Sequence, residues 1–462
     1  MPRRSFIAGS ASTAAVASFP LFPARTEQSS IKFPADFTWG VASSAFQIEG
    51  GLQVDGRGVS IWDDVADDAS HVNAEPAADH YRRWRYDVGL LEQLGVNAYR
   101  FSVAWPRILP EGVGTVNPLG LDFYDRLVDR LLSAGITPFL CLHHWDLPKS
   151  LQEKGGWRNR QIVERFTEYA GVVADRLGDR VNNWIGINEA YAIAYGGYGI
   201  AYWPPFIADE EAYFAVAHHL NLAQGATFKA LAQSGRKLGT AMTLNPVRPS
   251  SAASADVAAA EFHEAMSTKL FLDPLMRGIY PKLVEERVAP FIRDGDLDRI
   301  RHPVDFVGIN YYEPEYRRAL PGAPFNTEGT APSHIAATDS GALIEPDGLY
   351  EELANLRDLY GNPPIYVTEN GAAFEDRADA NFRAHDVKRI AFLRSHVIAS
   401  HRALTDGVNL RGYFVWSFLD SFEWRYGFTR RYGLVYIDLP TRKRVPKSSF
   451  DWYARLVREG VV

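Results

Sequence analysis

Short apolar runs recur along the chain, and longer amphipathic stretches separate them. The runs are Phe37–Phe46, Asn97–Val103, Thr137–His143, Val181–Ile187, Gly239–Leu244, Asp305–Tyr311, Ile365–Thr368 and Gly412–Phe418. Short apolar runs bounded by turn-forming residues predict buried β-strands. We therefore expect eight strands.

The stretches between these runs have the periodicity of amphipathic helices. Within 79–94, large apolar side chains recur at helical spacing from Tyr81 to Leu94, and Gly95 provides a stop. Residues 122–134 repeat the pattern. Alternation of strand and helix implies parallel strands, and eight such strands can close into a barrel without edges. The sequence thus predicts an α/β fold, a single (β/α)8 TIM barrel whose active site lies at the C-terminal ends of the strands.

No composition break or linker divides the chain after Phe33, so we expect one domain over residues 31–462. The longest irregular stretch, residues 313–347, is predicted to be a loop over one face of the barrel. A hydrophobic content of 46% and a charged content of 23% are typical of a globular protein without membrane insertion. The net charge of −7 argues against nucleic acid as a partner. The single cysteine, Cys141, excludes an intramolecular disulfide and is expected to be a buried strand thiol.

Residues 1–24 resemble an export signal. Arg3 and Arg4, followed by Phe6, are similar to a twin-arginine motif, and an Ala-rich apolar run follows them. Pro2 and Ala8 depart from the fuller form of that motif. The alternative, a disordered basic N-terminus, does not explain the apolar run. We expect export, to the periplasm of a bacterium.

Polar side chains gather at the C-terminal ends of seven of the predicted strands, the face where barrel enzymes place their sites. They are Gln47, Glu49, Arg100, His143, His144, Trp145, Asp146, Asn188, Glu189, Asn310, Tyr312, Glu369, Asn370, Trp416, Asp420 and Glu423. Glu189 and Glu369 follow different strands that aim into the same barrel mouth. Two such carboxylates can cleave a glycosidic bond, because one protonates the leaving oxygen while the other attacks the anomeric carbon.

Several ordered motifs extend this interpretation. They are Phe46-Gln-Ile-Glu-Gly, Tyr99-Arg-Phe-Ser, His144-Trp-Asp-Leu-Pro, Asn188-Glu, Asn310-Tyr-Tyr, Thr368-Glu-Asn-Gly, Trp416-Ser-Phe-Leu-Asp-Ser-Phe-Glu-Trp and Arg431-Tyr-Gly-Leu-Val-Tyr-Ile-Asp. With these motifs the chain resembles glycoside hydrolase family 1, the β-glucosidase family, from Phe33 to Trp452.

The resemblance implies that Glu189 is the acid/base and Glu369 the nucleophile. It implies substrate-binding roles for Gln47, His144, Asn188, Tyr312, Trp416, Glu423 and Trp424, and supporting roles for Arg100 and Asn310. Tyr312 would also orient the nucleophile region. No cofactor and no metal are implied, and His143 and His144 should point to opposite sides of their strand.

The function that the resemblance implies is that of a retaining, exo-acting β-glycosidase. The expected enzyme is a β-glucosidase that hydrolyses terminal β-D-glucosyl residues of β-glucosides and short β-linked oligosaccharides by double displacement. Glu423 would favour neutral over 6-phosphorylated sugars. Ile187, Ala190 and the segment Tyr202-Trp-Pro-Pro depart from the family pattern on the leaving-group side. The alternatives are another barrel glycosidase, such as an endoglucanase or xylanase, and a carbohydrate-binding barrel without catalysis.

Overall fold

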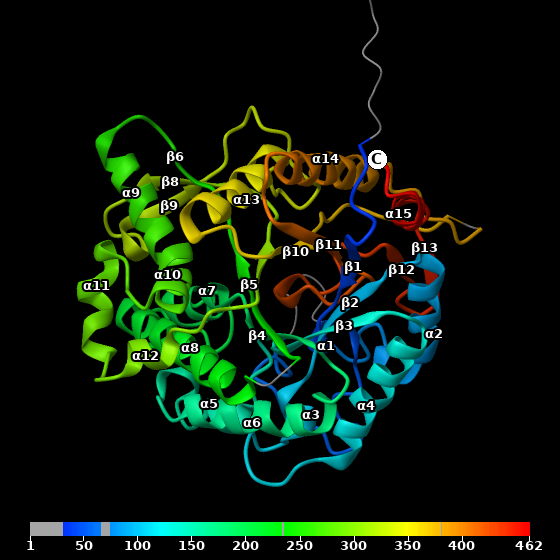
Figure 1. The fold of residues 1–462 in the computed structure, drawn as a ribbon, viewed down its shortest axis with the longest axis horizontal. Helices are drawn as coiled ribbons and strands as arrows, with labels where there is room; N and C mark the ends of the chain where they lie inside the picture. The colour runs from blue at the N-terminus through cyan, green and yellow to red at the C-terminus, as the bar shows by residue number, and fades with distance from the viewer. Residues whose placement is uncertain (1–30, 66–73, 233–234, 380) are drawn as a thin grey trace, which may run out of the picture.

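A computed structural model describes residues 31–65, 74–232, 235–379 and 381–462. Within them, eight parallel strands close into one barrel in the order β1-β11-β10-β7-β5-β4-β3-β2. The barrel strands are β1 (Thr38–Ala42), β2 (Ala98–Ser102), β3 (Thr137–His143), β4 (Asn183–Asn188), β5 (Lys237–Thr243), β7 (Phe306–Asn310), β10 (Ile365–Asn370) and β11 (Leu410–Trp416). Each overlaps one of the predicted runs, so the (β/α)8 barrel is confirmed. The strands lie at the centre of Figure 1, with helices around them.

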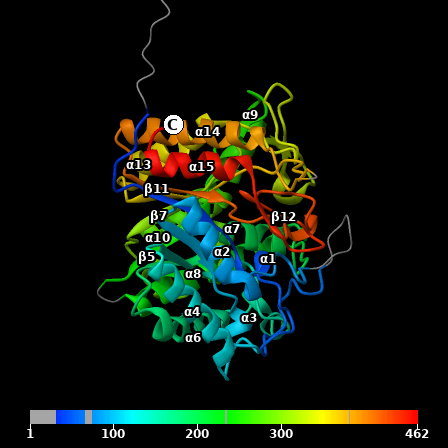
Figure 2. The same ribbon diagram turned by 90° about the vertical axis from the view of Figure 1, so that its right-hand side faces the viewer.

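The larger helices pack around the barrel. They are α2 (His80–Leu94), α4 (Pro118–Ser133), α6 (Ile162–Leu177), α8 (Glu210–Leu231), α9 (Ser254–Glu264), α10 (Leu270–Arg277), α13 (Pro346–Tyr360), α14 (Val387–Thr405) and α15 (Ser448–Glu459). Figure 2 shows α14 and α15 on one side of the barrel and α4 and α6 on the other. Helix α4 begins earlier than its predicted 122, because Asn117 caps it by accepting a hydrogen bond from Leu119 N at 3.2 Å.

Shorter elements fill the connections. They are α1 (Ala45–Ile48), α3 (Trp105–Ile108), α5 (Lys149–Gln152), α7 (Ala190–Ala192), α11 (Lys282–Val288), α12 (Asp296–Ile300), the 3-10 helices η1 (Gly156–Arg158), η4 (Ala289–Phe291), η5 (Pro324–Asn326) and η6 (Trp424–Tyr426), and the π-helices η2 (Ile193–Gly199) and η3 (Ala265–Lys269). The first predicted run was too long, because β1 ends at Ala42 and α1 follows it. Gln47 therefore projects from a helical turn rather than from a strand.

The prediction of an irregular loop over residues 313–347 was wrong in part. This stretch contains β8 (Glu315–Ala319) and β9 (Thr327–Thr330), which pair antiparallel and join β6 (Val247–Pro249) in a separate sheet. A sheet at the surface needs no apolar run, and an ion pair such as Arg318 with Glu328 can lie across the two strands. A hairpin of β12 (Val435–Ile437) and β13 (Arg444–Pro446) precedes α15.

The barrel interior is filled by side chains from its own strands. Phe139, Phe306 and Phe414 pack there with Cys141, which is buried as expected. A Cβ on Gly239 would lie 2.4 Å from the Phe306 ring, so the ring can occupy this position only because Gly239 has no side chain. A second, larger core lies between the barrel and the helices.

The start of the described chain lies beside its C-terminus, where Phe33 N donates to Gly460 O at 3.0 Å. The predicted export signal, residues 1–24, lies outside the described residues. No helix in the described part of the chain combines the length and hydrophobicity that a membrane crossing requires.

Candidate active site

A pocket of about 170 Å³ opens where the barrel strands end. Its walls are formed by His144, Trp145, Glu189, Trp203, Tyr312, Glu369, Trp416, Glu423, Trp424, Tyr426, Arg430 and Tyr432. The barrel therefore brings Glu189 and Glu369 into one pocket, although they are far apart in sequence. Register shifts interrupt the pairing of β4 with β5 before Asn188 and that of β10 with β7 before Glu369. Such bulges re-aim side chains and are common next to active sites.

Glu369 lies between a cation and a hydroxyl. The guanidinium of Arg100, from β2, donates to Glu369 Oε1, and Tyr312 OH donates to Glu369 Oε2 at 2.6 Å. The Arg100 side chain is 1% exposed, so its charge is poorly screened by water. Both carboxylate oxygens of Glu369 are thus occupied by donors, and its negative charge has a buried counterion.

Glu189 has a different environment. Asn310 Nδ2 donates to its Oε1 at 3.0 Å, and within the described part of the chain its carboxyl group forms no ion pair with a cation. Burial, together with the negative charge of Glu369, raises the pKa of Glu189 from its ordinary 4.5 to about 7, against the opposing effect of Asn310. The pocket therefore holds one carboxyl that can be protonated near neutral pH beside one that has a counterion.

The backbone of the pocket is strained at several bulky residues. Glu189, Trp145 and Trp424 adopt positive φ values of 49°, 80° and 52°. A positive φ is unusual for residues with large side chains, and such strain clusters at functional sites. These three residues come from the ends of different strands, so the strain belongs to the site as a whole.

Side-chain amides connect the two carboxyl groups. Asn310 Nδ2 also donates to Asn188 Oδ1 at 3.0 Å, and Arg100 donates to the same oxygen. Asn188 Nδ2 lies 3.3 Å from His144 Nε2, and Thr368 Oγ1 donates to Asn310 Oδ1 at 2.7 Å. Thr368 was not predicted as a site residue, although it opens the Thr368-Glu-Asn-Gly motif. The network fixes the orientation of Asn188 and Asn310.

A second polar group lies at the pocket wall, where Gln47, from behind the wall, contacts Glu423. Gln47 Nε2 lies 3.3 Å from Glu423 Oε1, which also accepts from Ser421 Oγ at 2.6 Å. Burial raises the pKa of Glu423 to about 8, because Ser421 offsets only part of the desolvation and Glu369 adds like charge. Glu423 is therefore largely neutral at pH 7. This changes the physical basis of the expected discrimination against phosphorylated sugars, which assumed a charged carboxylate.

Aromatic rings complete the pocket. The His144 ring lies nearly parallel to Trp416, at a centroid distance of 5.6 Å and an angle of 12°. The ring centroids of Trp145 and Trp424 lie 4.5 Å apart. Indole faces can cover the apolar face of a sugar ring. His144, Trp416, Glu423 and Trp424 thus lie where the sequence placed them.

Sequence reasoning missed four residues of the pocket wall, namely Trp203, Tyr426, Arg430 and Tyr432. Trp203 packs against Trp145 at 5.5 Å, and the hydroxyl groups of Tyr202 and Tyr426 form a hydrogen bond. The departure of Tyr202-Trp-Pro-Pro from the family pattern was the available signal. It showed that this loop differs but not that it reaches the pocket.

Two of the polar residues at the strand ends, Glu49 and His143, point elsewhere. Glu49 accepts from Arg107 and Tyr124 in a buried cluster, at 2.9 and 2.6 Å. His143 packs against the rings of Trp105 and Trp157, on the opposite side from His144, as expected. Burial lowers the pKa of His143 to about 3, so this imidazole is neutral.

Comparison with known proteins agrees with this geometry. Residues 29–461 match the profile of Glycosyl hydrolase family 1. The chain is 41% identical to "Beta-glucosidase A" of Thermotoga maritima over 439 residues, which cover 93% of this chain and 98% of that protein. It is 40% identical to the "Bifunctional beta-D-glucosidase/beta-D-fucosidase" of Bifidobacterium breve, with 92% and 98% covered.

Solved structures give the same result. The structure of the Thermotoga maritima β-glucosidase in complex with glucoimidazole superposes with a TM-score of 0.89 at 41% identity, covering 94% of this chain and all of that one. The match spans nearly the whole chain in both sequence and structure. The chain belongs to glycosyl hydrolase family 1.

Proposed function

We propose that this chain is a retaining, exo-acting β-glucosidase that hydrolyses terminal, non-reducing β-D-glucosyl residues of β-glucosides and short β-linked oligosaccharides. The observation that carries the proposal is the asymmetry of the two carboxyl groups in one pocket. Glu369 has Arg100 as a counterion, whereas burial raises the pKa of Glu189 to about 7. This is the division of charge that a nucleophile and a proton donor require.

In the proposed mechanism, Glu189 protonates the glycosidic oxygen while Glu369 attacks the anomeric carbon and forms a covalent glycosyl-enzyme. Glu189, now ionised, then removes a proton from a water molecule, whose oxygen attacks the anomeric carbon and breaks its bond to Glu369. This releases the sugar with its original configuration and restores both carboxyl groups. Tyr312 and Arg100 hold the attacking carboxylate, and Asn310 holds the donor. Gln47, His144, Asn188, Trp416, Glu423 and Trp424 would bind the sugar.

The names of the relatives support the substrate class, since the Thermotoga protein is named a β-glucosidase and the Bifidobacterium protein a β-glucosidase and β-fucosidase. An endoglucanase or xylanase is disfavoured, because the pocket wall includes the Trp416–Trp424 segment of family 1. A binding protein without catalysis would not need two carboxyl groups with such different environments.

The test is hydrolysis of 4-nitrophenyl β-D-glucoside by purified protein, followed by proton NMR from the first turnovers. We expect β-glucose as the first product. A slow substrate, 2,4-dinitrophenyl 2-deoxy-2-fluoro-β-D-glucoside, should label Glu369, which peptide mass spectrometry can locate. First-formed α-glucose, or a label on another residue, would contradict the mechanism.

We also propose that residues 1–24 direct export to the periplasm, and that residues 31–462 form the catalytic domain. The Arg3-Arg4 pair and the apolar run after it support this proposal. Fractionation of a bacterial host with twin-arginine transport should find activity in the periplasm. An Arg3→Lys/Arg4→Lys variant should remain in the cytoplasm, and unchanged distribution of this variant would contradict the signal.

A further inference from the structure

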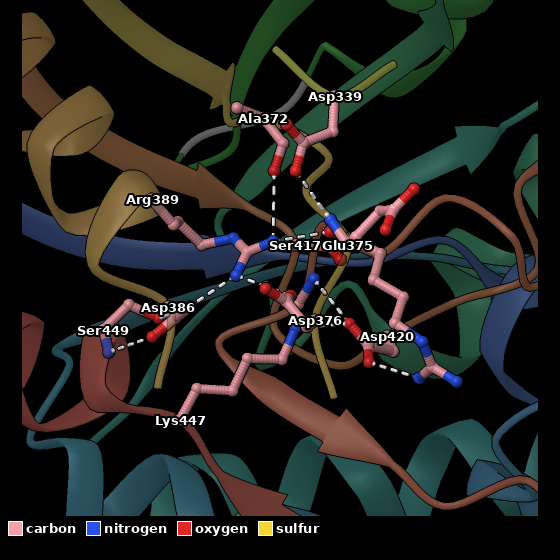
Figure 3. A network of polar contacts seen from close by, with 12 residues as sticks. Asp339, Ala372, Glu375, Asp376, Asp386, Arg389, Ser417, Asp420, Lys447 and Ser449 are labelled. Atoms are coloured by element: carbon pink, nitrogen blue, oxygen red, sulfur yellow. Dashed lines mark hydrogen bonds and ion pairs between the residues drawn. The ribbon is translucent and has the colours of Figure 1, made fainter. Parts of the chain in front are cut away.

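A buried network of ion pairs joins the segment that follows β10 to the segment that follows β11 (Figure 3). Its cations are Arg389, Arg431 and Lys447, and its carboxylates are Asp376, Asp386 and Asp420. Glu369 lies in β10, and Glu423 follows β11. The network therefore connects the two segments that carry the nucleophile and the sugar-binding wall.

Lys447 is at the centre of this network. It directly precedes α15, and its side chain is 0% exposed. Its Nζ lies 2.6 Å from Asp376 Oδ2 and 2.7 Å from Asp420 Oδ1. One ammonium group thus bridges two carboxylates that belong to different segments.

Asp420 connects Lys447 to the pocket wall. It lies between Trp416 and Glu423, both of which line the pocket. Its other oxygen accepts from Arg431 at 2.7 Å. The backbone N–H of Gly433 also donates to the Lys447-bound oxygen, at 3.0 Å. Burial would raise the pKa of Asp420, but the charges of Lys447 and Arg431 lower it below its ordinary value, so the carboxylate is charged and its donors are charge-assisted.

Asp376 and Arg389 make the corresponding connection to the nucleophile segment. Arg389 Nη1 lies 2.7 Å from Asp376, and its Nη2 donates to the carbonyl of Ala372, at 3.3 Å. Ala372 follows Glu369 closely in the chain. The two segments also touch directly, because a Cβ on Gly371 would lie 1.6 Å from the carbonyl oxygen of Trp416. A shift of either segment therefore displaces the other.

Stability alone is a weak explanation for so many buried charges. Desolvation of a buried ion pair offsets most of its attraction, and apolar packing of similar volume is often as stable. Directional bonds from fixed charges do, however, define one position for a loop that has no regular secondary structure. Residues Ser417–Glu423 are such a loop.

We propose that Lys447 is a positioning residue for the sugar-binding segment Trp416–Trp424, which it fixes relative to the Glu369 segment. The inference rests on the proposed function, in which Glu423 binds the terminal sugar; the resemblance to family 1 implies that its carboxyl group contacts the 4- and 6-hydroxyl groups. Lys447 lies outside the pocket wall and acts through Asp420.

The test compares wild type with Lys447→Met on two substrates, 4-nitrophenyl β-D-glucoside and its 6-deoxy analogue. Small displacements of substrate-positioning groups reduce rates by up to about a hundredfold. We expect kcat/KM for the glucoside to fall roughly ten- to a hundredfold, mainly through KM. The loss should be clearly smaller for the 6-deoxy substrate, because it lacks one of the hydroxyl groups that Glu423 would bind. A Lys447→Met/Glu423→Gln double variant should lose less than the sum of the two single effects.

Arg444→Met provides a matched control. Arg444 lies on β13, is 1% exposed and bridges both oxygens of Asp87, at 2.7 and 2.8 Å, away from the pocket. Its variant should lower the melting temperature but keep kcat/KM. Asp376→Asn keeps the shape of the network but removes one negative charge from it. This variant should show the same substrate dependence with a smaller loss of kcat/KM, and it tests the proposal if Lys447→Met does not fold.

Two results would overturn the positioning role. One is a folded Lys447→Met variant whose kcat/KM lies within twofold of wild type. The other is an equal loss on both substrates. Wild-type turnover of the glucoside tests the proposed function in the same experiment. If wild type is active and Lys447→Met has the same kcat/KM, the positioning role alone is refuted.

Discussion

Replacing Glu369 by Gln should lower the pKa of Glu189. The negative charge of Glu369 contributes to the raised pKa of Glu189, because two ionised carboxylates in one pocket repel each other. Gln has nearly the same shape as Glu and no charge. The variant therefore removes the repulsion while it leaves the burial of Glu189 unchanged.

The size of this change in the pKa of Glu189 follows from the environments of the two carboxyl groups. A pKa of about 7 instead of 4.5 corresponds to about 3 kcal/mol in favour of the neutral form of Glu189. Carboxylates about 5.5 Å apart, the spacing of retaining enzymes, repel by about 3 kcal/mol at an effective dielectric constant of about 20. Arg100, which pairs with Glu369, offsets part of this repulsion. Burial is the largest cause and remains, so we expect the pKa of Glu189 to fall by about 1 to 2 in Glu369→Gln.

The measurement is a carbon-13 NMR titration of protein labelled at glutamate side-chain carboxyl groups, with Glu189→Gln to assign the resonance. Glu352→Gln is the control, because Glu352 is another buried carboxyl with a raised pKa but does not line the pocket. In wild type, kcat/KM should be retained below pH 7 and fall above it, since Glu189 must be protonated to act as the acid. An unchanged or higher pKa of Glu189 in Glu369→Gln would refute the proposed coupling.

Three further predictions concern the pocket and the N-terminus. Glu369→Gln should lose more than roughly a thousandfold in kcat and should melt at a lower temperature, because it leaves Arg100 buried without its counterion; near-normal turnover would contradict the role of Glu369 as nucleophile. The pKa of Glu423 rises on folding from 4.5 to about 8, so its burial costs stability progressively as pH rises through this range. Glu423→Gln should therefore be more stable than wild type by about 4 to 5 kcal/mol at pH 8.5 but not at pH 4, and an equal difference at both pH values in denaturant unfolding would contradict this. Deletion of residues 1–24 should leave kcat/KM unchanged, and an inactive or insoluble product would show that the segment contributes to the fold.

The barrel could be predicted from sequence because its strands are buried on both faces and read as apolar runs. The surface sheet of β6, β8 and β9 could not, because β8 is Glu-Tyr-Arg-Arg-Ala, without an apolar run, and one of its two partners, β6, is distant in sequence. The end of β1 was misjudged for a related reason. The run Phe37–Phe46 stays buried through a strand and a helix, and burial alone does not distinguish the two.

Most of the candidate site could be predicted from the strand ends, because the C-terminal ends of all barrel strands meet at one face and polar residues recur there on seven of the predicted strands. The part of the pocket wall that comes from loops was harder to predict from the sequence. Trp203 and Tyr426 follow different strands, and their proximity depends on the path of two long loops. Lys447 was missed entirely, since a lysine near the C-terminus has no pattern that distinguishes a buried bridge from an exposed charge.

The asymmetry between Glu189 and Glu369 follows from the geometry of the barrel. Both are glutamates, both follow parallel strands, and both are buried, so neither residue type nor position assigns their charge. The difference lies in the neighbouring strands. Arg100 from β2 reaches Glu369 with its full positive charge, whereas Asn310 from β7 offers Glu189 only an amide. An amide cannot compensate for desolvation as a guanidinium can, so the proton stays on Glu189 near neutral pH. The neighbouring side chains, rather than the residue types, therefore determine which of the two carboxyl groups holds a proton near neutral pH.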